Sequence, residues 1–506
     1  MKELISKIST SYPMKKILTL SAVIAGFTLS GCSKLDEKPA SFLVAEQFYQ
    51  NEEQAVAAIT GAYRKLYEAG QSPYNRLFQI GVEMATDDYE AGPRARNAHV
   101  RAISGLTHDA SNDRMEEIWK TSYSGINAAN IAIDRIALID ASKINEQIRV
   151  RLINEAKFLR AIHYFNLVRL FGPVPIILQE PSSLNPAVLY VEKSSEEDVY
   201  NQIITDLKDA ENLPKASQYG AADVGRATSG AAKSLLAKVY LTKKDWPNAV
   251  LKSKEVIDNE GYDLFNDFAD VFAVNKKNGI EHIFSAQFKG NVGYGQTHML
   301  ASVSAPADVP GINGDYADAV YAGGGLYESF DAHDTRRAVT FITEITSPVN
   351  GQLYTLAAPH LYKYYDESVV GNQGQSSKNV PILRYAEVLL IYAEALNEDN
   401  DGPTAEAYWA IDKVRQRANI SKLEDIAPDL NEDDFRDSVF QERRKELVYE
   451  YQRWFDLSRR GAEYYVSTLK AAGKTAAAPR HIHFPTPQRE LNLNPNLKQH
   501  PDWVNY

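Results

Sequence analysis

TSGAAKSLLAKVYLTKKDWPNAVLKSKEVIDNE, residues 228–260, is the stretch with the sharpest helical pattern in this chain of 506 residues. Ala231 and Leu235 lie at helical spacing before a short turn at 243–245, and Trp246 opens a second apolar face after it. Small residues that face large ones across a short turn let two antiparallel helices approach closely, which is the tetratricopeptide plan. The stretch therefore predicts a pair of packed helices.

The same plan recurs far downstream, in residues 383–395 and 404–417. A single helical repeat unit cannot bury its own apolar face, so repeats are stable only when they stack. We therefore expect the helices of 52–260 to meet those of 381–418 in space. This arrangement predicts a mainly α scaffold of helical repeats that is interrupted by a large insertion.

Four stretches before residue 228 also show the apolar spacing of amphipathic helices. They are residues 52–68, 116–139, 144–171 and 195–213. The third is expected to end at Gly172-Pro173, because glycine readily caps a helix and proline does not continue one.

Residues 261–380 form the insertion, and they are rich in glycine, tyrosine, asparagine, proline and alanine. Runs such as GNVGYG, residues 290–295, are typical of loops. A similar irregular stretch covers residues 69–112. Binding residues usually lie on irregular segments that a rigid scaffold holds. We therefore expect a loop-rich ligand side with minor β structure.

The N-terminus has the pattern of an export signal. Lys15 and Lys16 precede an apolar run over residues 17–29, which is too short to span a bilayer of about 30 Å. Small residues follow, and then Cys32, the only cysteine of the chain. We expect a leader over residues 1–31, with Met14 as an alternative start.

The four residues LSGC, 29–32, resemble the site at which the lipoprotein signal peptidase cuts before a lipid-bearing cysteine. Cys32 would then become the first residue of the mature chain and carry a lipid such as palmitate. Residues 32–50 would form a polar tether, and residues 51–506 a single folded domain. No thiol would remain for a disulfide, so the fold must be stabilised by packing.

Composition excludes some partners. The formal net charge is −11, and removal of a leader with four lysines and one glutamate makes it more negative. Such a charge argues against nucleic acid and against docking on an anionic membrane surface. The chain also holds 29 tyrosines. Tyrosine suits helix packing and stacking on sugar rings equally well, so this count decides neither.

Catalytic motifs are incomplete. GRATSG, residues 225–230, has the spacing of a phosphate loop, but Ala231 stands where lysine is required. The imidazoles of HIH, residues 481–483, have no adjacent carboxylate or cysteine, and we interpret the segment as a short β-strand. The pairs Asp87-Asp88 and Asp331 with Asp334 are interpreted as structural or surface groups. We therefore predict a protein that is not an enzyme, with no cofactor and no metal.

Residues 442–457 combine many charges with aromatic residues. We interpret this run as a helix whose apolar face packs while its charges form pairs one turn apart and face solvent.

Four segments carry a resemblance to a known family. They are EAKFLRAIHYFNLVRLFGPVP (155–175), VPILRYAEVLLIYAEALN (380–397), ERRKEL with RWFDL (442–447 and 453–457) and FPTPQRELNLNPNLKQ (484–499). With Cys32, these segments resemble the SusD/RagB family of outer-membrane, nutrient-binding lipoproteins, and they occur in the family's order.

The resemblance implies a tetratricopeptide-like α half, an irregular half with the ligand site, and a C-terminal family segment over 440–506. It implies a lipid-anchored, surface-exposed outer-membrane protein that binds oligosaccharide and delivers it to a SusC-like TonB-dependent transporter. A peptide-binding subunit of the same kind of complex is the first alternative. An extracellular glycan hydrolase is the second.

The ligand site is predicted from loop chemistry, since sugars are held by exposed aromatic rings and by planar polar groups. The residues that we expect to contact ligand are Asp88, Tyr89, Arg94, Arg96, Asn291, Tyr294, Tyr316, Tyr321 and Tyr327.

Overall fold

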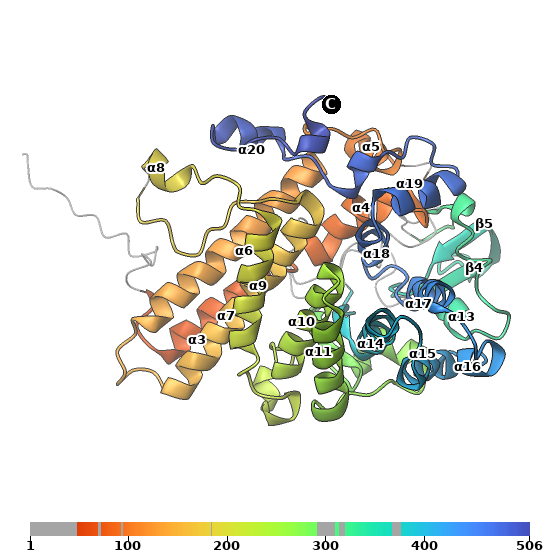
Figure 1. The fold of residues 1–506 in the computed structure, drawn as a ribbon, viewed down its shortest axis with the longest axis horizontal. Helices are drawn as coiled ribbons and strands as arrows, with labels where there is room; N and C mark the ends of the chain where they lie inside the picture. The colour runs from red at the N-terminus through yellow and green to blue at the C-terminus, as the bar shows by residue number, and fades with distance from the viewer. Residues whose placement is uncertain are drawn as a thin grey trace, which may run out of the picture. The chain divides into compact units, whose positions relative to one another are not determined.

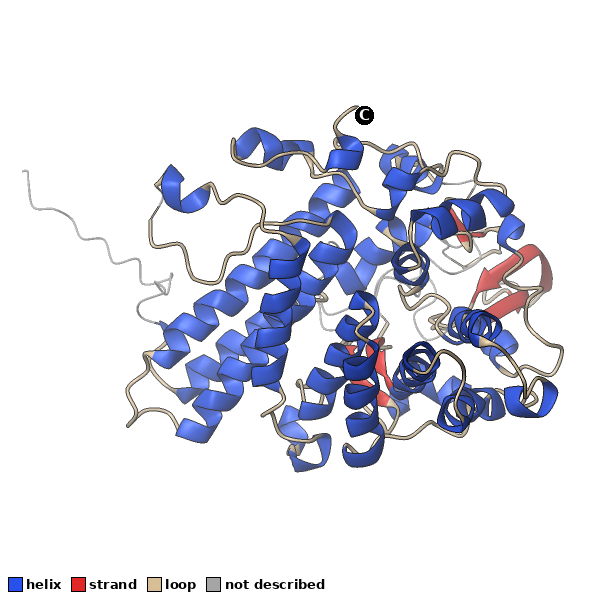
Figure 2. Ribbon diagram, in the orientation of Figure 1, coloured by secondary structure: helices blue, strands red, loops and turns tan. Residues whose placement is uncertain are grey.

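Long antiparallel helices make up most of the structure (Figures 1 and 2). The computed structural model describes residues 48–68, 72–92, 95–183, 185–290, 309–312, 319–366 and 376–506. The predicted leader, Cys32 and the tether up to residue 47 lie outside these ranges. Within them, no helix has a stretch that is long and apolar enough to cross a membrane. Residues Tyr49–Tyr506 form one compact unit.

The helices that precede residue 228 confirm the four predicted segments. They are α3 (Glu52–Arg64), α6 (Asp113–Ala137), α7 (Glu146–Phe171) and α9 (Glu196–Ala210). Each begins at a side chain that accepts a backbone N–H, namely Asn51, Asn112, Asn145 and Ser195. Helix α7 ends at Gly172, as expected. In Figure 1, α6, α7 and α9 lie side by side, and α7 contacts both neighbours.

The predicted repeat pairs are also confirmed. Helices α10 (Ser229–Lys243) and α11 (Trp246–Asn259) pack against each other, as do α14 (Tyr385–Asp399) and α15 (Ala405–Arg417). Helix α11 packs directly on α14, although more than a hundred residues separate them in sequence. The repeats therefore stack across the insertion, and α9 joins the array by packing on α10.

Two small antiparallel sheets account for the minor β structure (Figure 2). Strand β2 (His282–Ala286) pairs with β6 (Val380–Arg384), and every residue of both is buried. The second sheet has the order β1-β3-β5-β4. Its strands are β1 (Tyr89–Glu90), β3 (Ala319–Val320), β5 (Leu353–Leu361) and β4 (Phe341–Thr346). Because β1 comes from the irregular stretch 69–112, this sheet joins it to the insertion.

The remaining helices complete the fold. They are α4 (Phe78–Gly81), α5 (Ala98–Ser104), α8 (Pro186–Leu189), α13 (Arg336–Thr340), α16 (Leu423–Ile426), α17 (Glu432–Glu446), α18 (Arg453–Arg459), α19 (Ala462–Ala471) and α20 (Gln488–Leu493). Single turns include η2 (Glu83–Ala85), η9 (Pro479–Ile482) and η10 (Pro501–Trp503).

The interpretation of residues 442–457 as one helix was wrong. Helix α17 ends at Glu446, and α18 begins at Arg453. Between them Tyr449 and Tyr451 have φ angles of 60° and 62°, which a right-handed helix does not allow. The charges do not face solvent either, since Glu442, Arg443 and Glu446 are buried. Buried cations satisfy the backbone carbonyls at this end of α17. Arg384 donates to the Glu446 carbonyl, and Lys363 donates to the Val448 carbonyl just beyond the helix.

The predicted strand at residues 481–483 was also wrong. His481 lies in η9, a single helical turn that begins at Pro479. Its ring packs at a tilt on two other rings. The ring centroids are 5.2 Å apart for His481 and His108, and 5.6 Å apart for His481 and Trp503. Tertiary packing of aromatic rings, which a three-residue pattern does not contain, selects this conformation.

Helices α6 and α7 meet most closely at Gly125. A Cβ atom at this position would lie 2.0 Å from Nε2 of His163, a side chain of α7 that is fully buried. Only glycine fits between these two helices at this point.

We expect Gly125→Ala to lower the free energy of unfolding by about 1–3 kcal/mol, because the new methyl group must displace the His163 ring. Chemical denaturation followed by circular dichroism measures this change. Gly61→Ala is the matched control, since no atom lies within 4 Å of its Cβ position on α3. That control should stabilise by up to about 1 kcal/mol. Equal destabilisation by both changes would contradict the close-approach argument.

Candidate ligand-binding site

Strand pairing brings three of the predicted site residues together. Tyr89 of β1 pairs with Val320 of β3, and the Tyr321 N–H donates to the Asp88 carbonyl at 2.8 Å. The irregular stretch 69–112 and the insertion therefore share one structural centre. Both stretches are expected on one side from their composition, but the pairing of β1 with β3 is not predictable from their sequences.

Asp88 and Tyr89 do not fit the prediction that they contact ligand, because their side chains are 2% and 1% exposed. Nε of Arg444 donates to the Asp88 carboxylate at 2.9 Å, and the Tyr89 hydroxyl accepts the Tyr449 N–H at 2.9 Å. Both side chains therefore make hydrogen bonds inside the protein. They tie the first irregular stretch to the segment that contains Arg444 and Tyr449.

Tyr321 is held firmly while it keeps part of its surface open. The ammonium of Lys474 lies 5.2 Å from the centre of its ring. That ammonium also donates to the carbonyls of Met84 and Tyr89, at 3.0 and 2.7 Å. Burial lowers the pKa of Lys474 to about 8. Tyr321 is partly buried, and the Lys474 ammonium lies against its ring.

Tyr327 lines an open pocket of about 410 Å³, together with Arg337, Phe341, Thr343 and Glu344. Nη2 of Arg337 donates to the Tyr327 hydroxyl at 2.8 Å, and its guanidinium lies 4.3 Å from the ring centre. This volume is in the range of small-ligand sites. Arg337 was missed by sequence analysis, since its spacing from Tyr327 matches no motif.

The remaining predicted residues are less informative. Arg96 is exposed in the loop before α5. The other four, Arg94, Asn291, Tyr294 and Tyr316, lie outside the described residues.

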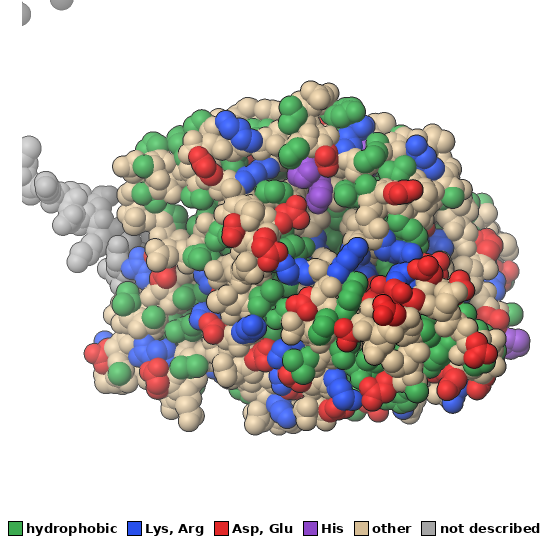
Figure 3. All heavy atoms as spheres, viewed as in Figure 1, with side chains coloured by type: hydrophobic (Ala, Val, Ile, Leu, Met, Phe, Trp, Pro, Cys, Tyr) green, Lys and Arg blue, Asp and Glu red, His purple; other side chains and the backbone are tan. Residues whose placement is uncertain are grey.

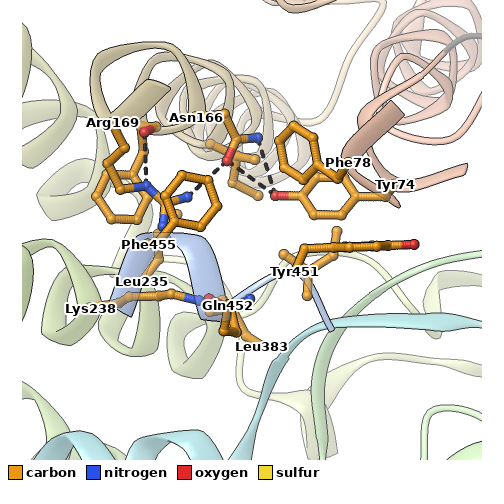
Figure 4. A pocket seen from close by; sticks show the side chains of 13 residues that line it. Tyr74, Phe78, Asn166, Arg169, Leu235, Lys238, Leu383, Tyr451, Gln452 and Phe455 are labelled. Carbon is orange, nitrogen blue, oxygen red and sulfur yellow. Dashed lines mark hydrogen bonds between the residues drawn. The ribbon is translucent and has the colours of Figure 1, made fainter. Parts of the chain in front are cut away.

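A second cavity lies in the interior and is too small for a ligand. Its volume is about 10 Å³, enough for about one water molecule. Figure 4 shows Arg169 beside Phe455, with a hydrogen bond to Asn166. The guanidinium is also 3.8 Å from the ring centre of Phe165, so two aromatic faces enclose it. We assign this cavity to the architecture.

Comparison with known proteins matches the whole chain. The SusD family model matches residues 316–503, and a model described as "Starch-binding associating with outer membrane" matches residues 35–241. A SusD-like protein of Formosa agariphila is 32% identical, over 96% of this chain and 99% of its own length. The chain belongs to the SusD family.

Other SusD-family proteins support the assignment. The starch-binding protein SusD of Bacteroides thetaiotaomicron is 22% identical over 85% of this chain and 86% of its own. The crystal structure of a SusD homologue from the same species superposes with a TM-score of 0.77, at 26% identity over 91% of this chain and 98% of that one. The predicted fold class, a helical-repeat scaffold of the SusD type, is therefore confirmed.

The acidic pairs of this SusD-family chain have structural contacts. Arg453 binds the Asp87 carboxylate at 2.9 and 2.7 Å, and Arg336 binds Asp334 at 2.9 and 2.7 Å. Asp331 is exposed and accepts from its neighbour His333. These positions agree with the structural and surface roles that the sequence suggested.

Glu83 lies in the turn η2, close to the buried carboxylate of Asp88. Its side chain is 1% exposed, and burial together with the negative charge of Asp88 raises the pKa of Glu83 to about 8. The folded protein therefore binds a proton here that the unfolded chain releases above its ordinary pKa of 4.5. It follows that this group costs stability as the pH rises from about 4.5 to 8.

We expect Glu83→Gln to remove this cost. The variant should come within about 1 kcal/mol of the wild type near pH 5 and exceed its free energy of unfolding by about 4–5 kcal/mol at pH 9, since one unit of pKa difference is worth about 1.4 kcal/mol. Denaturant titrations between pH 5 and 9 measure the difference, and the other titrating groups cancel because both proteins contain them. Glu463→Gln, an exposed site on α19, should give a curve parallel to the wild type. A parallel curve for Glu83→Gln itself would disprove the buried proton.

Proposed function

We propose that this protein binds a glycan on the side formed by residues 69–112 and 261–380, and passes it to a TonB-dependent outer-membrane transporter. Two family names support the choice of ligand. One matching family model is described as starch-binding, and the relative from Bacteroides thetaiotaomicron is named a starch-binding protein.

The observation that carries the proposal is the state of Tyr321. Its backbone is fixed to Asp88, its ring faces Lys474, and part of the ring remains open to solvent. A rigid, partly exposed aromatic ring is suited to stacking on a pyranose face, because little conformational freedom is lost on binding. The pocket that Tyr327 lines offers polar groups, among them Arg337 and Thr343, as hydrogen-bond partners for hydroxyls.

The remaining predicted contacts stay part of the proposal. Arg96 is exposed in the first irregular stretch, and Arg94, Asn291, Tyr294 and Tyr316 belong to the same two stretches of sequence. We propose that the protein is not an enzyme. We further propose that Cys32 carries a lipid that anchors the protein at the outer membrane, where the transporter would also lie.

We expect Tyr321→Ala to weaken retention by soluble glycans in affinity electrophoresis by about tenfold, since one stacking face is worth roughly 1–2 kcal/mol. Trp409→Ala is the matched control, because Trp409 is 41% exposed on α15, outside both stretches of sequence. Circular dichroism checks that both variants fold.

Three outcomes would count against the proposal. Retention of peptides but of no glycan would replace the ligand class. Release of reducing sugar on prolonged incubation of the pure protein would replace binding by hydrolysis. Unchanged retention by Tyr321→Ala would remove Tyr321 from the site.

The anchor has a separate test. Cells that express the wild type and are fed labelled palmitate should incorporate label into this protein, whereas Cys32→Ala should incorporate none. Ser33→Ala keeps the thiol and is the control that should remain labelled. Label on the Cys32→Ala protein would show that the lipid is attached elsewhere or that the chain is processed differently.

A further inference from the structure

Two histidines and an aspartate from the C-terminal segment converge at the surface. His483 follows the turn η9, His500 caps η10, and Asp502 lies within η10. Each offers one ligand atom, and these atoms all lie within 4.8 Å of one another. Figure 3 shows histidine side chains beside an acidic side chain in the upper part of this face, where the C-terminal segment lies in Figure 1. His483 was not predicted to be a metal ligand, because no carboxylate is adjacent to it in sequence.

The two imidazoles leave nitrogen atoms available. The ring centroids of His483 and His500 are 4.7 Å apart, at an interplanar angle of 37°. Nδ1 of His483 is buried and has no hydrogen-bond partner in the described part of the chain. Nδ1 of His500 has only a long contact of 3.3 Å to the Asp502 N–H, and the Asp502 carboxylate lies 3.7 Å from it. The buried Nδ1 of His483 therefore calls for a partner, and Nδ1 of His500 and the Asp502 carboxylate lie close enough to share it.

We propose that His483, His500 and Asp502 bind a divalent transition-metal ion, with Zn²⁺ as the best fit. Imidazole nitrogen and carboxylate oxygen are its preferred ligands, at about 2.0–2.2 Å in a tetrahedral shell. A shell of that size needs ligand atoms about 3.3 Å apart. The exposed side chain of Asp502 supplies the closing movement, and the ion displaces the long N–H contact of His500. A water molecule takes the fourth position.

The far side of His500 is built to hold its ring. Nε2 lies 3.0 Å from the Cβ position of Gly172, and Oε1 of Glu196 lies 3.2 Å from the same point. Both atoms crowd this point at the end of α7, so the His500 ring has little room to turn on this side. Gly172 has a φ of 66°, so both its conformation and this crowding require glycine.

One positive charge opposes the ion. Lys193 is near enough to lower the pKa values of both histidines. Its ammonium donates to Oγ1 of Thr486 at 2.7 Å, and burial lowers its own pKa to about 8. The carboxylate of Asp502 offsets this charge.

A bound ion would connect the chain end to the segment that follows η9, so it should stabilise the fold. The test uses the mature chain without an affinity tag. We expect one equivalent of Co²⁺ to give a visible d–d band of tetrahedral type, one equivalent of Zn²⁺ to remove it, and Zn²⁺ to raise Tm. Asp502→Asn, at an exposed position, should weaken Zn²⁺ binding by about tenfold or more, as measured by competition with a chromophoric chelator. His483→Ala should abolish the band.

The matched control is His333→Ala. Nδ1 of His333 lies 3.1 Å from the Asp331 carboxylate, but this exposed pair belongs to no three-residue cluster among the described residues. The control should bind Zn²⁺ as the wild type does. The proposal is overturned if the wild type shows neither band nor Tm shift, or if Asp502→Asn and His483→Ala bind as tightly as the wild type. Loss of binding by His333→Ala would also overturn it.

Discussion

The carboxylate of Glu446 is the point on which the fold depends. It is fully buried, and three guanidinium groups surround it: Arg336 at 2.9 Å, Arg384 at 2.6 Å, and Arg417. Burial alone would raise the pKa of Glu446, but the attraction of the three arginines outweighs burial and holds it well below its usual range. These partners belong to α13, β6 and α15, so one side chain of α17 joins three distant segments. Loss of one member would leave buried charge unpaired, at a cost of about 3–5 kcal/mol.

Helix α17 also contacts both irregular stretches, residues 69–112 and 261–380, on which the proposed site lies. Arg444, two residues before Glu446, holds Asp88 and donates to the Gly324 carbonyl at 2.7 Å. It therefore fixes the backbone on both sides of Tyr321, through Asp88 in one stretch and the turn after Tyr321 in the other. The scaffold and the proposed site are thus one electrostatic system. The charged run that looked like a solvated helix face is the link between them.

The sequence predicted the helices well because apolar periodicity is a local signal. Residues 228–260 contain their own spacing, turn and caps, and the structure reproduces them. The burial of Glu446 and Asp88 was not predictable in this way, because their partners Arg417 and Arg444 lie 29 and 356 residues away in sequence. His483 and His500 meet although 17 residues separate them and no helix or strand period relates them. Side chains that are satisfied by distant segments look like surface groups in one dimension.

The pairing of β2 with β6 has a consequence for how such a protein diversifies. The two strands register Ala286 against Val380 and His282 against Arg384, so the part of the insertion that follows β2 begins and ends at one buried strand pair. Its ends stay fixed whatever lies between them. Doubling the length of such a loop costs only about 0.6 kcal/mol in closure entropy. Loops of a different length and composition can therefore replace these loops while the helical array keeps its stability. The chemistry of the loops can then change faster in evolution than the helical scaffold does.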